Sequence, residues 1–167
     1  DIVVLACGKS QAQRLLRSVD EEALTGITPV RASTLDATLS SRPLGEKHGI
    51  IDAQEGAYVF DLANIQPRLG LQGAFLSAVM VEQENESKEA RADRFERFLE
   101  QHAKGWQHHV LHERRQENIV VQTKGKKPAY DAYVSNGFLL AGEWVASDHE
   151  LADAAAETGR KCGQSIA

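Results

Sequence analysis

The stretch at residues 137–155, GFLLAGEWVASDHELADAA, combines an apolar run, a carboxylate and a helix start. The apolar run ends at Ala141, Glu143 follows after Gly142, and an alanine-rich segment begins at Leu151. A carboxylate at the end of a strand can accept hydrogen bonds from ligand hydroxyls. A helix N-terminus offers partial positive charge and free N–H groups to a phosphate. The stretch therefore fits a nucleotide cofactor site, and by pattern alone it fits an ordinary strand-to-helix turn at least as well.

The segment after this turn is predicted to be a helix over residues 151–165, preceded by a capping box in which Ser147 and Glu150 satisfy each other's backbone N–H groups. Small side chains dominate the helix, so another backbone or a flat ligand could approach it closely. Its inward stripe is predicted to comprise Leu151, Ala155, Thr158 or Gly159, Cys162 and Ile166.

Bulk composition limits the classes of function. The 167 residues suit one domain or slightly more, and the net charge of −5 disfavours general affinity for nucleic acid. The basic cluster at 124–127 is predicted to be a solvated loop. Cys7 and Cys162 have no metal-ligand spacing, so we expect two free thiols in a reducing cytoplasm and no metal site.

No run approaches the roughly 18 apolar residues of a membrane span, which leaves only peripheral contact with a membrane open. No signal peptide is recognisable, and the chain opens without methionine on an apolar run. We therefore expect it to be part of a longer protein. The oligomeric state cannot be inferred from the pattern.

Hydrophobic patterning predicts an α+β fold, with a mixed, mostly antiparallel sheet covered by helices. The clearest helix spans residues 87–104, with Ser87 as N-cap and Gly105 in a left-handed conformation after it. Its apolar residues recur at helical spacing and should cover the sheet: Phe95, Phe98, Leu99, His102 and Trp106. The other predicted elements are a fully buried strand at 2–6, a helix at 10–17, strands at 30–39 and 74–81, one long strand or two at 109–122, and a strand or hairpin at 50–62 broken near 55–56.

Other residues that could do chemistry have simpler interpretations. His102, His108, His109 and His112 are close in sequence, but a strand would place His109 opposite His108 and His112, so exposed histidines are favoured over a metal site. Asp36 is either a buried functional acid or, more simply, a residue on the wet face of a strand. Trp106 and Trp144 are interpreted as packing residues rather than stacking platforms.

Residues 137–163, GFLLAGEWVASDHELADAAAETGRKCG, resemble the C-terminal flavin motif of the FAD-dependent phytoene desaturase and amine oxidase superfamily. That motif reads as a strand, Ala-Gly-Asp-Trp, a Gly-containing turn and a Leu-Ala-Asp-Ala-Ala helix. Further segments resemble the same family in the same order. Residues 1–16, DIVVLACGKSQAQRLL, are similar to the strand and helix that return to the FAD domain, and residues 28–43, TPVRASTLDATLSSRP, are similar to the Pro-Val-Arg-Ala-x-x-Leu-Asp strand. Residues 58–81, YVFDLANIQPRLGLQGAFLSAVMV, are similar to the Ala-Asp-Leu-Ala-Pro-x-Gly-Gly segment. Residues 102–115, HAKGWQHHVLHERR, are similar to the Pro-Gly-Trp-x-x-x-Val segment.

The resemblance implies three parts: residues 1–24 returning to an FAD-binding domain, 25–126 forming a substrate-binding domain, and 127–167 forming the C-terminal FAD-binding segment. In the family this last motif closes over FAD. Carried over, the resemblance implies that the cofactor-binding residues are Gly142, Glu143, Trp144, Leu151, Ala152 and Asp153. The implied substrate is a small apolar molecule or an amine, and no catalytic residue can be named.

Two side chains depart from the family pattern. Glu143 stands where the family usually has Asp, and His149 stands where it usually has Gly. No Gly-x-Gly-x-x-Gly follows any strand, so the N-terminal dinucleotide fold that holds the ADP half of FAD is missing from these residues. We therefore expect a fragment of a flavin-dependent oxidoreductase that is inactive alone. The alternative is a self-contained α+β ligand-binding or protein-interaction module without a cofactor.

Overall fold

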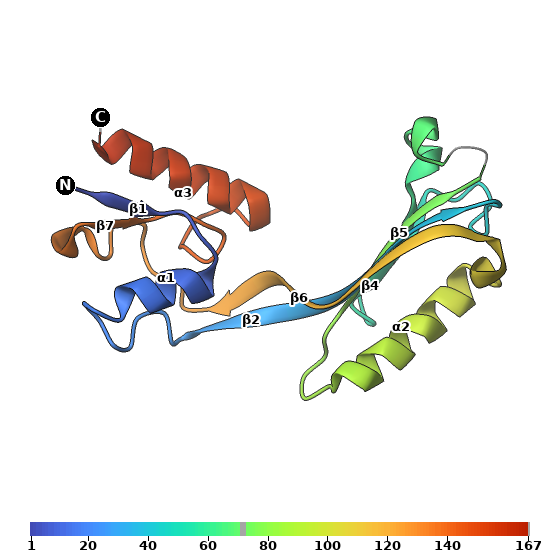
Figure 1. Ribbon diagram of the computed structural model, residues 1–167, viewed down its shortest axis with the longest axis horizontal. Helices are drawn as coiled ribbons and strands as arrows, with labels where there is room; N and C mark the ends of the chain where they lie inside the picture. The colour runs from blue at the N-terminus through green and yellow to red at the C-terminus, as the bar shows by residue number, and fades with distance from the viewer. Residues whose placement is uncertain (71–72, 167) are drawn as a thin grey trace. The chain divides into compact units, whose positions relative to one another are not determined.

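The computed structural model describes residues 1–70 and 73–166 of the chain, which form two compact units (Figure 1). One unit comprises Asp1–Val30 together with the chain from Val121 onward, and the other comprises Arg31–Val120. Leu71 and Gln72, part of the segment likened to the Gly-Gly motif, lie outside the described residues. The predicted part borders at 24/25 and 126/127 fall close to the unit borders, and the roles assigned to these parts remain predictions.

The antiparallel sheet predicted from the alternating segments is present, which confirms the α+β class. Its strands are β2 Ile27–Leu39, β3 Gly49–Asp52, β4 Ala57–Asp61, β5 Phe75–Val81 and β6 Val110–Gly125. Their order in the sheet is β3-β4-β5-β2-β6, and β2 and β6 contribute residues to both units. Asp36 pairs with Ser77 between β2 and β5, and Phe60 pairs with Ser77 between β4 and β5. The segment at 50–62 is thus a hairpin, which is one of the two structures predicted for it.

Helix α2, Lys88–His102, covers one face of this sheet, as its apolar spacing predicted. Ser87 is the N-cap, and its hydroxyl accepts the Ala90 N–H at 3.1 Å. Gly105 has the expected left-handed conformation, with φ of 71°, although the helix ends earlier, at His102. The core under the helix comprises Leu35, Ala37, Leu39, Leu44, Ala57, Val59, Ala74, Leu76, Ala78, Met80, Phe95, Phe98, Leu99, Ala103 and Trp106.

The other unit is built on a parallel pair of strands, β1 Val3–Leu5 and β7 Phe138–Leu140. Helix α1, Lys9–Leu16, packs on one face through a cluster that includes Leu5 and Leu140. Helix α3, Leu151–Ile166, packs on the other face through Cys162. The predicted fully buried strand at 2–6 is wrong. The strand is three residues long, and Ile2 and Val3 are 45% and 51% exposed.

The inward stripe of α3 was only partly predicted. Thr158 and Cys162 are buried as expected, together with Ala154, but Leu151 and Ile166 are about half exposed because the helix contacts the strands over its middle turns. Short 3-10 helices complete the described chain: η1 Leu62–Asn64, η2 Pro67–Leu69, η3 Trp106–His109 and η4 Val134–Asn136.

Candidate functional site

The candidate site lies where the parallel strands β1 and β7 end. Parallel strands place their carboxyl ends at the same edge of a sheet, which is where ligands bind in open α/β folds. Here β1 runs into Cys7 and Gly8 before α1, and β7 runs into the Gly142–Glu143 turn. The indole Nε1 of Trp144 donates a hydrogen bond of 2.9 Å to the Cys7 carbonyl, which ties the two strand ends together.

Gly142 makes the sharp change of direction after β7. Its φ of 154° is unfavourable for other residues, and a Cβ there would lie 2.5 Å from Trp144 Nε1. Its N–H donates to the Oγ1 of Thr158 at 3.0 Å, and the same hydroxyl lies 2.8 Å from the Ala154 carbonyl. Thr158 is fully buried, so the hydroxyl fixes α3 against the turn.

The Glu143 carboxylate is held by the end of β6. Its Oε2 accepts hydrogen bonds from Thr123, one from the backbone N–H at 3.1 Å and one from Oγ1 at 2.9 Å. Lys127 Nζ lies 3.8 Å from the same oxygen and donates to the Glu143 carbonyl at 2.6 Å. Within the described chain no hydrogen bond reaches Oε1. The carboxylate is thus oriented by the protein and retains one oxygen for another donor.

The predicted capping box does not form. Ser147 Oγ instead accepts the His149 N–H at 3.1 Å, and Glu150 accepts from Gln122 Nε2 at 3.2 Å and lies 3.8 Å from Lys127 Nζ. The helix begins at Leu151, which has a φ of 52°, a left-handed conformation that disfavours leucine. The carboxylate of Glu150 contacts Gln122 and Lys127 and makes no hydrogen bond to the Ser147 N–H in the described chain.

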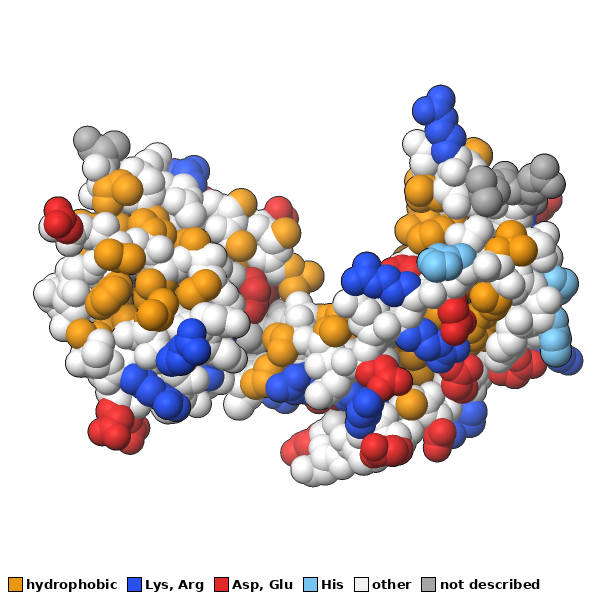
Figure 2. Space-filling view, in the orientation of Figure 1, with side chains coloured by type: hydrophobic (Ala, Val, Ile, Leu, Met, Phe, Trp, Pro, Cys, Tyr) orange, Lys and Arg blue, Asp and Glu red, His pale blue; other side chains and the backbone are white. Residues whose placement is uncertain are grey.

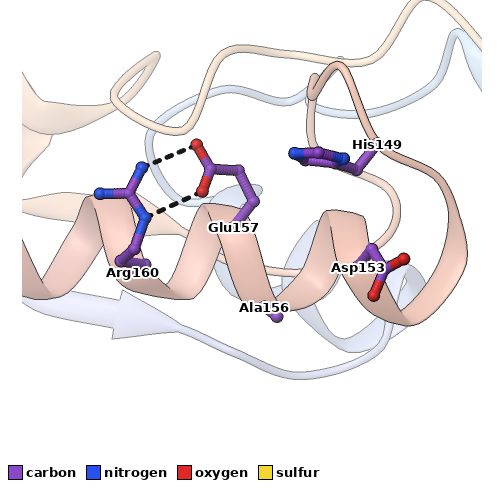
Figure 3. A pocket seen from close by; sticks show the side chains of 5 residues that line it. All are labelled: His149, Asp153, Ala156, Glu157 and Arg160. Carbon is purple, nitrogen blue, oxygen red and sulfur yellow. Dashed lines mark hydrogen bonds and ion pairs between the residues drawn. The ribbon is translucent and has the colours of Figure 1, made fainter.

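A shallow pocket of about 310 Å³ lies on the outer face of α3. Figure 3 shows its lining residues, with the His149 ring above the helix and Asp153 on the first turn of the helix. Glu157 and Arg160 form two hydrogen bonds across one helical turn, of 2.8 and 2.9 Å, and the guanidinium lowers the pKa of the Glu157 carboxyl. Of the charged side chains on this surface, Glu157 and Arg160 are thus already paired with each other.

The six cofactor-binding residues implied by the resemblance are divided between the turn after β7 and the start of α3. Gly142 and Glu143 form the turn, and Trp144 is 2% exposed, as a packing residue should be. Leu151, Ala152 and Asp153 are exposed at the start of α3, and of the six only Asp153 lines the pocket. The structure therefore groups Glu143 with Thr123 and Lys127, and groups Asp153 with His149.

Thr123, Lys127 and Thr158 were not predicted as functional residues. The basic cluster is solvated at Lys124 and Lys126, as expected, but Lys127 is only 17% exposed because it turns toward Glu143. Pro128 follows it, and the Pro128 carbonyl accepts the Ala146 N–H at 2.8 Å. No sequence period relates residues 123–128 to 143–146, so only the tertiary fold reveals this contact.

The remaining candidates follow their simpler interpretations. His108 and His109 lie in η3 rather than in a strand, and together with His112 they are exposed. Asp36 is half-buried and accepts a hydrogen bond of 2.8 Å from Ser77 Oγ. Both cysteines are free, and burial raises the pKa of the Cys162 thiol. Residues 1–70 and 73–166 contain no group of three or more His, Cys, Asp or Glu arranged to hold a metal ion.

None of the helices in the described part of the chain is both long enough and apolar enough to cross a membrane. A scan against protein-family models and a search of curated proteins both return no match for this chain.

Proposed function

We propose that this chain is the C-terminal part of an FAD-dependent oxidoreductase of the phytoene desaturase and amine oxidase type, inactive without a preceding dinucleotide-binding fold. FAD, when bound, would take a hydride from a C–H bond of the substrate. The role of this chain would be to orient the flavin and exclude water from it. The resemblance of five colinear segments supports the proposal, and the parallel β1–β7 pair is the structural observation that carries it.

Parallel pairs belong to α/β sheets that bind ligands at their carboxyl ends. In this chain that edge carries a glycine turn, a carboxylate and the start of a helix: Gly142, Glu143 and Leu151. Glu143 is fixed by Thr123 through Oε2, so Oε1 can accept a hydrogen bond from a ligand hydroxyl without rearrangement. The exposed backbone at Ala152 and Asp153 would lie under the flavin, and Trp144 would support the turn from below.

The sheet face opposite α2 has side chains that favour the proposal of an apolar or amine substrate. Tyr58 and Phe60 are in ring contact there, with centroids 5.4 Å apart, and Val79 is the partner of Tyr58 in the next strand. Asp36 places a carboxylate on the same face, and burial together with its charge raises the pKa of Tyr58. We propose that the aromatic rings contact the apolar part of a substrate and that Asp36 pairs with an amine where one is present.

The experiment that tests the proposal begins with the coding DNA upstream of Asp1. We expect it to encode, in frame, a strand, Gly-x-Gly-x-x-Gly and a helix, with an acidic residue about 20 positions later. The polypeptide that includes this sequence should be purified yellow, with one flavin per chain by absorbance after denaturation. An upstream reading frame without this motif, or a longer polypeptide that takes up no FAD, would contradict the proposal.

Glu143→Gln in that polypeptide tests the proposed contact. The expected loss of FAD affinity is about tenfold or more, because a hydrogen bond to a charged group contributes about 1.5–3 kcal/mol. Asp148→Asn is the matched control, since Asp148 is exposed in the same turn and the charge change is identical. Equal affinities in the two variants would remove Glu143 from the cofactor site.

A further inference from the structure

The chain contains four asparagines, and only Asn136 is followed by glycine. Spontaneous loss of the side-chain amide requires the backbone nitrogen of the next residue to reach the asparagine Cγ, and glycine has no Cβ to obstruct that approach. Asn64 and Asn118 precede isoleucines, whose branched side chains crowd the nitrogen, and Asn85 precedes a glutamate. The Asn136–Gly137 bond is therefore the position at which the sequence most favours this reaction.

Hydrogen bonds hold the carboxamides of two other asparagines. Asn64 is held at both ends of its carboxamide, by hydrogen bonds of 2.6 and 3.0 Å. The Asn118 Oδ1 accepts a hydrogen bond of 3.1 Å from the buried Arg91. Asn136 is exposed, and its Oδ1 accepts a single long hydrogen bond, from Ser135 Oγ at 3.4 Å. Within the described chain no hydrogen bond reaches its Nδ2, which is the group that would leave as ammonia.

The fold keeps the attacking nitrogen in a hydrogen bond. Asn136 ends the 3-10 helix η4, and the Gly137 N–H donates to the Val134 carbonyl at 3.0 Å. Attack on Cγ requires this nitrogen to lose its proton and to rotate toward the side chain, and both changes break that bond. The helix η4 is three residues long and all three are exposed, as expected of an element that opens at a low free-energy cost. The reaction should therefore proceed while η4 is locally open.

We infer that Asn136 is a self-modification site, at which opening of η4 lets the Gly137 nitrogen attack Cγ, and that the isoaspartate formed there separates β7 from β1. A C–N bond forms between these two atoms, and the bond from Cγ to Nδ2 breaks. The side-chain nitrogen leaves as ammonia and takes the proton of the Gly137 N–H. Water then opens the cyclic imide at either of its carbonyls, which gives aspartate or isoaspartate. The inference rests on η4 and β7 and is independent of the proposed function.

Isoaspartate lengthens the backbone immediately before β7, because the main chain then runs through the former side chain and gains a methylene group. The Gly137 carbonyl accepts the Val3 N–H at 2.8 Å, next to the first residue pair of the parallel strands, Val3 and Phe138. A hydrogen bond tolerates little displacement, so the longer backbone breaks this contact. Figure 2 shows hydrophobic side chains gathered over β1, between α1 and α3, and separation of the strands would enlarge this apolar surface.

Peptide mass spectrometry of residues 1–167, incubated at neutral pH in the folded state and in urea, tests the modification. We expect the Asn136 side chain to exchange NH₂ for OH, with isoaspartate as the main product, and no comparable change at Asn64, Asn85 or Asn118. The folded chain should react about 10- to 100-fold more slowly than the unfolded chain, because only molecules with an open η4 react. A ratio outside this range, or an equal rate at another asparagine of the folded chain, would overturn the inference.

Two substitutions of Asn136 separate the reaction from its effect on the strand pair. Asn136→Gln keeps a carboxamide, but its carbonyl carbon is one bond farther from the Gly137 nitrogen, so this variant should stay intact in the same incubation. Asn136→Asp carries the charge of the product without the longer backbone. Amide exchange at Val3 should be about tenfold or more faster in the purified isoaspartate product than in the parent chain, and unchanged in Asn136→Asp. Equal Val3 exchange in product and parent, or equally fast exchange in Asn136→Asp, would overturn the inferred effect of the longer backbone.

Discussion

Arg94 of α2 and Glu86, just before the helix, form a nearly buried ion pair in which both carboxylate oxygens meet the guanidinium. The distances are 2.8 Å from Nε to Oε1 and 2.9 Å from Nη2 to Oε2, and the side chains are 10% and 9% exposed. The hydrogen bonds that Arg94 donates to the Glu86 carboxylate lower the pKa of Glu86 and raise the pKa of Arg94. Planar pairing of this kind fixes the segment before α2 against the helix, and Arg94 Nη2 also donates to the Val81 carbonyl of β5 at 2.7 Å.

Glu86→Gln should destabilise the unit that contains α2, by about 2 kcal/mol at pH 7, because it removes a charge-assisted pair with little exposure. The folded pKa of Glu86 lies below its unfolded value of 4.5, so its contribution is present above that pH and is lost as the pH falls through the lowered pKa. Urea unfolding at pH 7 and pH 3 measures this difference, with exposed Glu84→Gln as control. A difference between the two variants that is the same at both pH values would contradict the assignment.

The arginines on the buried face of α2 show a limit of sequence reasoning. The apolar positions from Phe95 to Trp106 were predicted because their spacing alone carries the signal. Arg91 lies one turn before Phe95 and Arg94 lies one turn before Phe98, and these arginines are 1% and 9% exposed. Their partners lie elsewhere in the chain, so the sequence marks them as solvent-facing. For Arg91 these partners are Ser33, Glu82 and Asn118.

The candidate site likewise contains features that the local sequence predicts and contacts that it does not. The strand, the Gly142 turn and the helix were predictable because local pattern encodes each of them. The capping box was also a local prediction, and it fails because Lys127 and Gln122 engage Glu150 from a distant segment. Pairing of β1 with β7 joins segments more than 130 residues apart, and no local rule specifies it.

Tyr133 and Asp20 provide a spectroscopic test of the unit that holds the candidate site. The phenol donates to Asp20 Oδ2 at 2.7 Å, and burial with this hydrogen bond raises the pKa of Tyr133 to about 12. A raised pKa means that the stabilisation is present below the unfolded value of 10 and is lost as the pH rises through about 12. Absorbance titration should therefore show a tyrosine step near pH 12 that is absent from Tyr133→Phe. Tyr130→Phe should keep it, and a step that survives in Tyr133→Phe would refute the assignment.

Two substitutions of Thr158 distinguish the effect of its hydroxyl on the Gly142 turn from the effect of its side chain on the packing of α3. Thr158→Val preserves shape but leaves the Gly142 N–H without an acceptor, at a cost of about 2 kcal/mol. Thr158→Ser keeps the acceptor and loses a buried methyl group, at a cost of about 1 kcal/mol. We therefore expect the serine variant to be the more stable in urea unfolding, although it fills the core less well. Packing alone predicts the opposite order, so a valine variant as stable as the parent chain would show that the hydroxyl does not position the turn that carries Glu143.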